Sequence, residues 1–375
     1  IRAAVLEAAR IYVGLVKEGA AMGVLDLGGG LAVDYDGSHT NFSGSRNYSL
    51  DEYSADIVEQ VMTSLDAADI AHPILITESG RAVVAYYSVL LFNILDVSRF
   101  ETHPPPESLP KEAPELLHKL FEIPGDITSR NVQECYHDAL YYRDEIRQLF
   151  KHGNITLRER ALAEQMFWHI MKVVLRYIKK MKYVPDEFEG LANRLADTYY
   201  GNFSVFQSLP DSWAIDQLFP IMPVHRLNEC PSCQGVIADI TCDSDGKIDR
   251  FISLHDVSRT LPLHPLLDDE EYYLGAFLVG AYQETLGDLH NLLGDTNVVS
   301  VRIHEDGHIE YLREIEGDTV ADVLTYVEHD TRALLTRFRQ NAEEAVRAGR
   351  IQPEELQEIL RFVEEGLRGY TYFER

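Results

Sequence analysis

The chain has few basic residues relative to its acidic ones. Its 375 residues include 34 Lys plus Arg against 61 Asp plus Glu, so the formal net charge is −27. A surface this acidic repels phosphate backbones, which argues against nucleic acid as a partner. The same surface attracts cations, which fits a basic small molecule as substrate and fits plain solubility equally well.

Cysteines and long apolar runs are also scarce. Four cysteines in 375 residues do not make a disulfide framework and suit a reducing compartment. The longest apolar stretch, residues 83–97, is interrupted by Ser88, Asn93 and Asp96, and no stretch is long enough to cross a bilayer. The sequence therefore predicts a cytoplasmic protein that does not engage a membrane.

The chain has no signal peptide and no initiator methionine. It opens on Ile1-Arg2-Ala3-Ala4 and continues directly into an amphipathic pattern. We expect it to have been cut from a longer protein. Its length favours two or three domains.

The first hundred residues alternate between helix and strand. Apolar spacing predicts a helix over residues 2–19 and another over 51–65, with Asp51 as its N-cap. Short apolar runs predict strands over 23–27 and 72–77. This alternation is typical of a parallel sheet or barrel, whose active sites gather beyond the carboxyl ends of the strands. Both Gly28–Gly30 and Glu78–Arg81 follow such an end.

The rest of the chain changes character twice. Residues 114–199 are mostly helical in pattern, and the pattern is helical again from Thr319 to about Gly369. Between them lie short predicted strands over 203–207, 236–241, 248–253, 273–279 and 298–303. The predicted fold is therefore α/β plus all-β with a helical insertion.

Two motifs at the predicted strand ends have the chemistry of an anion or cofactor site. The three glycines 28–30 leave backbone N–H groups open to a phosphate, but they match neither the dinucleotide fingerprint nor a P-loop, so a tight turn is an equal alternative. Glu78 and Arg81, separated by the flexible Gly80, offer a carboxylate for a protonated ring nitrogen and a guanidinium for a phosphate. The alternative is a structural ion pair.

Three later motifs each have a functional and a structural interpretation. Cys230 and Cys233 have CxxC spacing but no second pair, so loop cysteines are favoured over zinc or redox use. Cys242-Asp243 follows an apolar strand and offers a proton donor beside a carboxylate, or a buried Cys beside a turn-capping Asp. Tyr282 is a candidate phosphate donor and His290 a candidate base, but by pattern alone a packed tyrosine and a surface or capping histidine are favoured.

The order of these motifs resembles the fold-type III pyridoxal-phosphate decarboxylases, and within them the biosynthetic arginine decarboxylases. The strings that carry the resemblance are Leu25–Tyr35 (LDLGGGLAVDY), Ile76–Val83 (ITESGRAV), Phe206–Asp216 (FQSLPDSWAID), Ala238–Asp245 (ADITCDSD) and Gly275–Leu292 (GAFLVGAYQETLGDLHNL). It extends over almost the whole chain. It implies decarboxylation of L-arginine to agmatine on a route to polyamines such as spermidine, with pyridoxal phosphate and usually Mg²⁺ as cofactors.

The resemblance also implies a role for each motif residue. Glu78 would pair with the pyridine nitrogen, Cys242 would return a proton to the α-carbon, and Asp243 would bind the substrate's cationic end. The cofactor phosphate would be held by Gly28, Gly29, Gly30, Arg81 and Tyr282, and Gly80 would also belong to the cofactor site. The substrate-binding stretch would be Leu25, Asp26, Leu27, Gly28, Gly29, Gly30, Leu31, Ala32, Val33, Asp34 and Tyr35.

The architecture that the resemblance implies has four parts. These are the C-terminal half of a pyridoxal-phosphate-binding TIM barrel over 1–98, a helical insertion over 99–199, a β domain that completes the site over 200–318, and terminal helices over 319–375. The active unit would be a homodimer or higher homo-oligomer whose sites are shared between subunits.

One residue that the family requires is not evident. The cofactor is anchored on a lysine in an early barrel strand, and the lysines here stand at 17, 111, 119, 151, 172, 179, 180, 182 and 247, none of them after a strand upstream of Gly28. We expect the first half of the barrel, with that lysine, to lie outside this chain. The alternatives are another basic amino-acid decarboxylase of the same fold, acting on ornithine, diaminopimelate or carboxynorspermidine, and a catalytically dead regulatory subunit.

Overall fold

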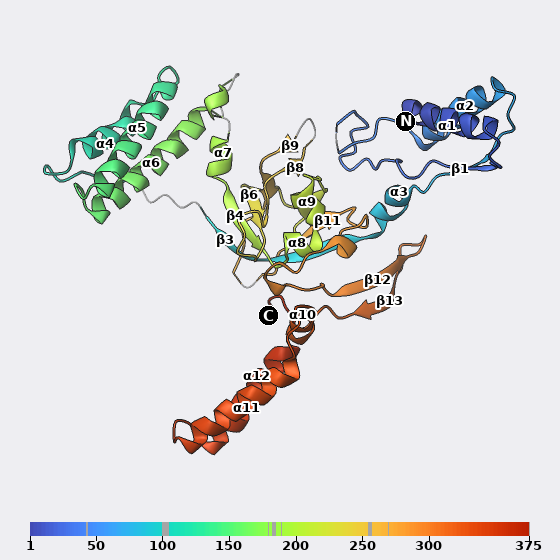
Figure 1. The fold of residues 1–375 in the computed structure, drawn as a ribbon. Coiled ribbons are helices and arrows are strands. Elements are labelled where there is room, and N and C mark those ends of the chain that lie inside the picture. The colour runs from blue at the N-terminus through green and yellow to red at the C-terminus, as the bar shows by residue number, and fades with distance from the viewer. Residues whose placement is uncertain are drawn as a thin grey trace. The chain divides into compact units, whose positions relative to one another are not determined.

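The computed structural model describes residues 1–42, 44–99, 105–178, 180–181, 185–188, 190–253, 257–268 and 270–374. The chain forms two compact units. The first comprises residues 1–96, 199–231 and 237–375, and the second comprises residues 97–198 and 232–236. Figure 1 follows the elements along the chain by colour.

The first unit begins with two helix–strand repeats. They are α1 (Arg2–Lys17), β1 (Val24–Asp26), α2 (Leu50–Asp66) and β2 (Ile74–Ile76), and the two strands pair in parallel with Leu25 opposite Leu75. The helices form because apolar residues recur at helical spacing and meet in one core. Its buried members include Val5, Ala9, Tyr12, Tyr53, Ile57, Val61 and Leu65. The predicted α/β alternation is confirmed for this part of the chain.

The N-terminus of α2 is capped by a residue other than the predicted one. The Ser49 side chain accepts the Glu52 N–H at 3.1 Å, and the Glu52 carboxylate accepts the Ser49 N–H at 2.7 Å. This is a capping box, which satisfies two backbone donors at once. The prediction of Asp51 as N-cap was wrong, because Asp51 lies inside the first turn.

The largest sheet has seven strands. Its strands are β3 (Val89–Ser98), β4 (Asp197–Gly201), β5 (Ile221–Pro223), β6 (Cys233–Ala238), β7 (Lys247–Ile248), β10 (Leu261–Leu263) and β11 (Tyr273–Phe277). The order is β10-β6-β4-β3-β11-β5, and β7 pairs with β6. Within it, β11 pairs in antiparallel fashion with β3 and with β5, as does β6 with β7. Phe92 and Phe203 stack at 4.2 Å between ring centroids in its core. Two small antiparallel pairs accompany it, β8 (Phe251–Ile252) with β9 (Val257–Ser258) and β12 (Val298–Ile303) with β13 (Ile309–Ile315).

The predicted strand over 203–207 is a helical turn instead. α8 (Val205–Ser208) begins there and α9 (Pro210–Ala214) follows it. The Ser204 side chain accepts the Gln207 N–H, and the buried Asp239 carboxylate accepts the Val205 N–H at 2.8 Å. These two acceptors satisfy the first N–H groups of a helix, so the apolar run is buried without a strand partner.

Three helices end the first unit, as the helical pattern after Thr319 predicts. They are α10 (Val320–Tyr326), α11 (Thr331–Arg347) and α12 (Pro353–Arg368). Thr319 and Asp322 form a capping box at the start of α10. Asp330 caps α11 by accepting two backbone N–H groups.

The second unit is a helical bundle. It contains α4 (Glu115–Asp126), α5 (Val132–Lys151), α6 (Leu157–Ile178) and α7 (Leu191–Arg194), and the 3₁₀ turn Asp186–Phe188 precedes α7. The three long helices share one apolar core, at whose centre Leu117, Leu120 and Ile170 are fully buried. Arg147 on α5 and Glu164 on α6 form a bidentate ion pair, with N···O distances of 2.6 and 3.0 Å.

Replacing Leu117 by alanine is expected to destabilise this bundle by about 2–5 kcal/mol, because it leaves a cavity among fully buried side chains. The measurement is hydrogen exchange of amides in α4–α6 as a function of denaturant. Leu157→Ala is the matched control, because Leu157 is 69% exposed and its loss should change stability by less than about 0.5 kcal/mol. Equal effects at the two positions would contradict the packing described here.

Candidate active site

The glycine turn after β1 has the open backbone of an anion site. Gly28 and Gly30 have φ values of 67° and 115°, which side-chain-bearing residues rarely adopt. The Gly28 N–H donates to Asp26 Oδ1, and its carbonyl accepts the Glu78 N–H, both at 2.8 Å. Among the described residues, nothing accepts the N–H groups of Gly29 and Gly30. Two free amides side by side are suited to an anion.

Arg81 brings three distant parts of the chain together. It lies in the short helix α3 (Gly80–Val84), which follows β2 and begins within the predicted motif Glu78–Arg81. Its Nη1 donates to Tyr35 Oη and to the Ala281 carbonyl, both at 3.0 Å, while Nη2 lies 3.8 Å from Asp211 Oδ2. Nε and Nη2 form no hydrogen bond with any described residue. The guanidinium is thus held as an ion pair and still has donors to offer an anion.

Tyr282 lies against the backbone of Gly80. A Cβ atom at position 80 would be 2.8 Å from Tyr282 Oη, closer than real Cβ contacts allow. Tyr282 Oη can therefore come this close to the backbone because residue 80 is a glycine. Arg81 also lies over the Tyr282 ring, 5.6 Å from its centroid, and the phenol remains 39% exposed. The structure places Gly80, Arg81 and Tyr282 in one cluster.

A buried amide–carboxylate pair supports Arg81. The Asp211 N–H donates to Gln283 Oε1 at 3.0 Å, and Gln283 Nε2 donates to Asp211 Oδ2 at 2.9 Å. The same Nε2 is 3.2 Å from the Ala281 carbonyl that Arg81 also reaches. Both residues are at least nine-tenths buried, so these contacts fix the carboxylate beside the arginine.

Tyr35 is buried and accepts a hydrogen bond from Arg81. Burial raises the pKa of Tyr35, and the hydrogen bond from Arg81 acts in the opposite direction. The phenol therefore stays neutral over the physiological range and holds the guanidinium without adding charge. Sequence reasoning placed Tyr35 in the substrate-binding stretch, and the structure connects it to the second motif.

The stretch after the glycine turn alternates between buried and half-buried residues. Leu31, Val33 and Tyr35 are buried, whereas Ala32 and Asp34 are only partly covered. Tyr48 Oη bridges the turn to this stretch, because it contacts the Gly30 carbonyl at 3.3 Å and accepts the Ala32 N–H at 3.1 Å.

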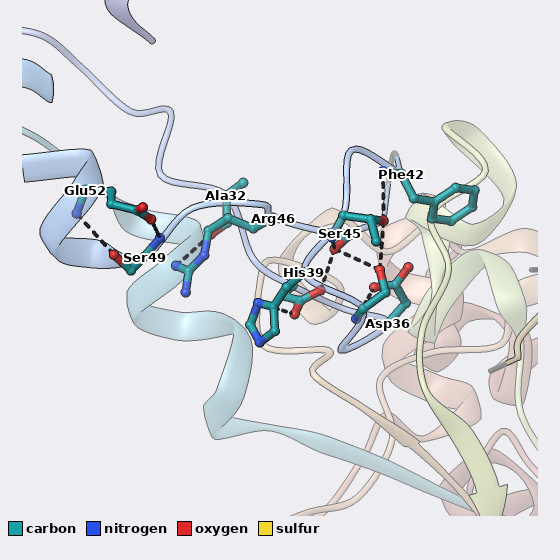
Figure 2. A network of polar contacts seen from close by, with 11 residues as sticks. Ala32, Asp36, His39, Phe42, Ser45, Arg46, Ser49 and Glu52 are labelled. Carbon is teal, nitrogen blue, oxygen red and sulfur yellow. Dashed lines mark hydrogen bonds and ion pairs between the residues drawn. The ribbon is translucent and has the colours of Figure 1, made fainter. Parts of the chain in front are cut away.

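The Asp34 carboxylate is engaged by the loop that follows. One oxygen accepts Ser45 Oγ–H at 2.8 Å and the other lies 3.0 Å from His39 Nδ1. Figure 2 shows this network and Arg46, whose Nη1 donates to the Ala32 carbonyl at 3.3 Å. Asp34 therefore holds the loop in shape, a role that its position in a predicted substrate stretch does not suggest.

The Glu78 side chain is exposed, and its carboxylate accepts no hydrogen bond from any described residue. Only its backbone is engaged, through the N–H that the Gly28 carbonyl accepts. The two strand-end motifs thus meet at this bond. A carboxylate left free beside a glycine turn is available to a ligand.

Cys242 and Asp243 lie in the loop after β6, held by the residues His290-Asn291. The Cys242 N–H donates to Asn291 Oδ1 at 3.0 Å, and Asn291 Nδ2 donates to Cys242 Sγ at 3.4 Å. The Cys242 side chain is exposed rather than buried, so the alternative of a buried packing cysteine was wrong. Asn291 stood in a string that carried the family resemblance, but sequence reasoning gave it no role.

Asp243 both caps a turn and faces a histidine. Its Oδ1 accepts the Asp245 N–H at 2.9 Å, as the turn-capping alternative predicts. Its Oδ2 lies 3.9 Å from His290 Nε2, a buried nitrogen without a hydrogen-bond partner among the described residues. The His290 ring packs on Phe206, 4.5 Å between centroids. One carboxylate oxygen therefore remains for a cation.

The CxxC pair forms no metal site in the described structure. Cys230, Cys233 and the other two cysteines are all free thiols. Among the described residues, no three His, Cys, Asp or Glu side chains gather in a way that could hold a metal ion. No helix among the described residues is both long and apolar enough to cross a membrane.

The Arg81 and Cys242 clusters are not bonded to each other. No hydrogen bond or ion pair between described residues joins the group around Gly28–Gly30, Arg81 and Tyr282 to the group around Cys242 and Asp243. Each group instead contacts a different part of one segment, residues 280–292 after β11, at Ala281 and at Asn291.

Three protein-family models match separate parts of the chain. Residues 1–85 match a pyridoxal-dependent decarboxylase pyridoxal-binding domain, residues 110–192 an arginine decarboxylase helical bundle domain, and residues 320–373 an arginine decarboxylase C-terminal helical extension. These matches fall on the two helix–strand repeats, the bundle and the terminal helices.

Full-length comparison agrees with the family models. The chain is 46% identical to the biosynthetic arginine decarboxylase of Gloeobacter violaceus and 48% identical to that of a Nostoc species, in each case over 99% of this chain. It spans 58% and 54% of the lengths of those two proteins. The crystal structure of the biosynthetic arginine decarboxylase of Campylobacter jejuni matches all of this chain and 60% of its own, at 32% identity and a TM-score of 0.81. The fold is that of the pyridoxal-phosphate-dependent decarboxylases, and over almost all of its length the chain is similar to biosynthetic arginine decarboxylases, of which it spans a little over half.

Proposed function

We propose that the protein releases CO₂ from L-arginine to give agmatine, with pyridoxal phosphate as cofactor, in a route to polyamines such as spermidine. The observation that carries this proposal is the Arg81 cluster. An arginine with free donors and a glycine turn with open amides lie in the part of the chain that matches the pyridoxal-binding family, and the exposed Tyr282 packs against that arginine. These groups fit a phosphate monoester.

Each motif residue has a separate task in this proposal. The N–H groups of Gly29 and Gly30, the Arg81 guanidinium and Tyr282 Oη hold the phosphate, and Gly28 and Gly80 give the backbone the shape that this requires. The free Glu78 carboxylate keeps the pyridine nitrogen protonated. When bound, pyridoxal phosphate draws electrons away from the α-carbon so that CO₂ can leave.

The second cluster deals with the substrate. Cys242 supplies the proton that the α-carbon takes up after CO₂ has left, and Asp243 binds the substrate guanidinium through its free oxygen. The stretch 25–35 forms one wall of the substrate site. Within it, Asp34 contacts Ser45 and His39 and so shapes this wall.

We infer a homodimer or higher homo-oligomer in which each site draws on two subunits. The support is that no bond between described residues joins the Cys242 cluster to the Arg81 cluster. We further infer that residues 1–98 are the C-terminal half of a TIM barrel and that residues 200–318 complete the site. We assign none of this chain's lysines to the cofactor Schiff base and no step to Mg²⁺. The free cysteines support a cytoplasmic location.

The test of the proposed function is CO₂ release by the protein expressed from its own gene. L-Arginine, L-ornithine and meso-diaminopimelate are compared with and without added pyridoxal phosphate. Release from arginine well above the other two substrates is the expected result. Preference for ornithine or diaminopimelate would replace the substrate assignment, and the absence of any turnover would favour a regulatory role.

Replacing Arg81 by alanine is expected to weaken pyridoxal phosphate binding about ten- to hundredfold, the range for losing a hydrogen bond to a charged group of about 1.5–3 kcal/mol. The phosphate is unchanged in the reaction, so saturating cofactor should restore most of the turnover. Equilibrium dialysis measures the first effect and CO₂ release the second. Arg10→Ala, which removes an exposed positive charge from α1, is the matched control. A loss of turnover that saturating cofactor does not restore would contradict the phosphate role.

A further inference from the structure

Asn291 makes two contacts with one residue. Its side-chain oxygen accepts the Cys242 backbone N–H at 3.0 Å, and its side-chain nitrogen donates to Cys242 Sγ at 3.4 Å. An uncharged amide is the side chain that presents an acceptor and a donor on one planar group. The pair closes a small ring of contacts between positions far apart in the sequence, and it fixes both the backbone and the sulfur of Cys242.

The backbone at position 291 also limits which residue can stand there. Asn291 has φ 56° and ψ 21°, inside a single 3₁₀ turn at residues 290–292, and Leu292 has φ 56° as well. Asparagine, aspartate and glycine accept this left-handed conformation more readily than other residues. Of these three, only asparagine has the donor that reaches Sγ.

We propose that Asn291 is a positioning residue for Cys242, which orients the thiol and stabilises the sulfur after it has given up its proton. This rests on the proposed role of Cys242. In that step the S–H bond breaks and its electron pair stays on sulfur, while the proton forms a new C–H bond at the α-carbon that has lost CO₂. The sulfur is then a thiolate, and the Asn291 N–H donates to it. A hydrogen bond to the charged form favours that form.

The test measures the sulfur directly, without substrate or cofactor. The protein is treated with iodoacetamide at one pH, and the alkylation rate of each cysteine is followed by peptide mass spectrometry. Asn291→Asp keeps the acceptor and the left-handed backbone but replaces the donor with a negative oxygen beside the sulfur. It should slow alkylation of Cys242 about tenfold or more, since the thiolate is the reacting form.

Two controls make the result specific. Cys230 is exposed on the same chain and should react at the wild-type rate in every variant. Asn154→Asp adds the same charge at an exposed position in the second unit and should leave Cys242 unchanged. Asn291→Gly keeps the backbone and removes both contacts, so it should also slow Cys242, though less than the aspartate. Rates at Cys242 within about twofold of wild type in both position-291 variants would overturn the proposal.

The same variants separate this inference from the proposed function. Asn291→Asp should lower kcat with little change in KM, because the step affected comes after substrate has bound. If alkylation slows in Asn291→Asp but Cys242→Ala turns over normally, the positioning of Cys242 stands and its catalytic role is wrong. If alkylation is unaffected while Cys242→Ala is inactive, the catalytic role stands and the positioning is wrong.

Discussion

Replacing Glu78 by glutamine is expected to slow CO₂ release by about 10²–10³-fold, the usual loss when one group that stabilises developing charge is removed. The carboxylate is exposed and has no partner among the described side chains, so it makes no visible contribution to packing. A neutral amide of the same size cannot keep a pyridine nitrogen protonated, so the cofactor becomes a weaker electron acceptor. Cofactor affinity should change little, because the phosphate contacts remain.

The role of Glu78 is tested by measuring CO₂ release at saturating pyridoxal phosphate, with equilibrium dialysis to confirm that the cofactor is bound. Glu59→Gln, an exposed position on α2, is the matched control for loss of a negative charge. Turnover near the wild-type value with full occupancy would show that Glu78 serves only the backbone bond between its N–H and the Gly28 carbonyl.

Replacing Cys242 by alanine is expected to lower kcat by about 10²–10⁴-fold, the typical contribution of a positioned proton donor. KM should stay nearly constant, since the thiol acts after substrate has bound. Asp243→Asn should have the opposite profile, with KM raised about ten- to hundredfold through the weaker contact with the guanidinium. Steady-state kinetics with L-arginine distinguishes the two. If both variants changed KM alone, Cys242 would be a binding residue and not a proton donor.

The Cys242→Ala and Glu78→Gln variants together test whether the site is shared. If each site takes Glu78 from one subunit and Cys242 from its partner, a mixed dimer contains one intact site and one site with both defects. Random subunit exchange should therefore recover about a quarter of the wild-type activity from two nearly inactive proteins. No recovery, with exchange confirmed by mass spectrometry, would place both residues in the same subunit's site.

Much of the fold follows from local sequence pattern. The helices α1 and α2 have apolar residues at regular helical spacing, so their positions are readable from the sequence within a few residues. The turn at 205–208 is different, because its apolar run fits strand and helix equally. Its helical form depends on Asp239, which is distant in the sequence and invisible to a local pattern.

The candidate site divides in the same way. Arg81 and Cys242 are candidates because they follow predicted strands, but the pattern alone leaves an ion pair and a buried cysteine open as alternatives, and only the family resemblance favours a role in the site. Gln283 and Asn291 do not stand out, since a neutral amide in a loop is common and its importance comes from partners far along the chain. Asp211 is hidden for the same reason, as only the fold brings it beside the arginine.

The segment 280–292 has a consequence for which changes in length the protein can tolerate. Gln283 secures its beginning to Asp211, Asn291 secures its end to Cys242, and Gly287 between them lies so close to Gln207 that a Cβ would be 2.5 Å from the Gln207 carbonyl oxygen. Surface loops usually accept insertions and deletions during evolution. Here one added or deleted residue would move one amide away from its partner while the other stayed in place. We therefore expect sequence changes in this segment to be substitutions only, with the number of residues between Gln283 and Asn291 kept constant.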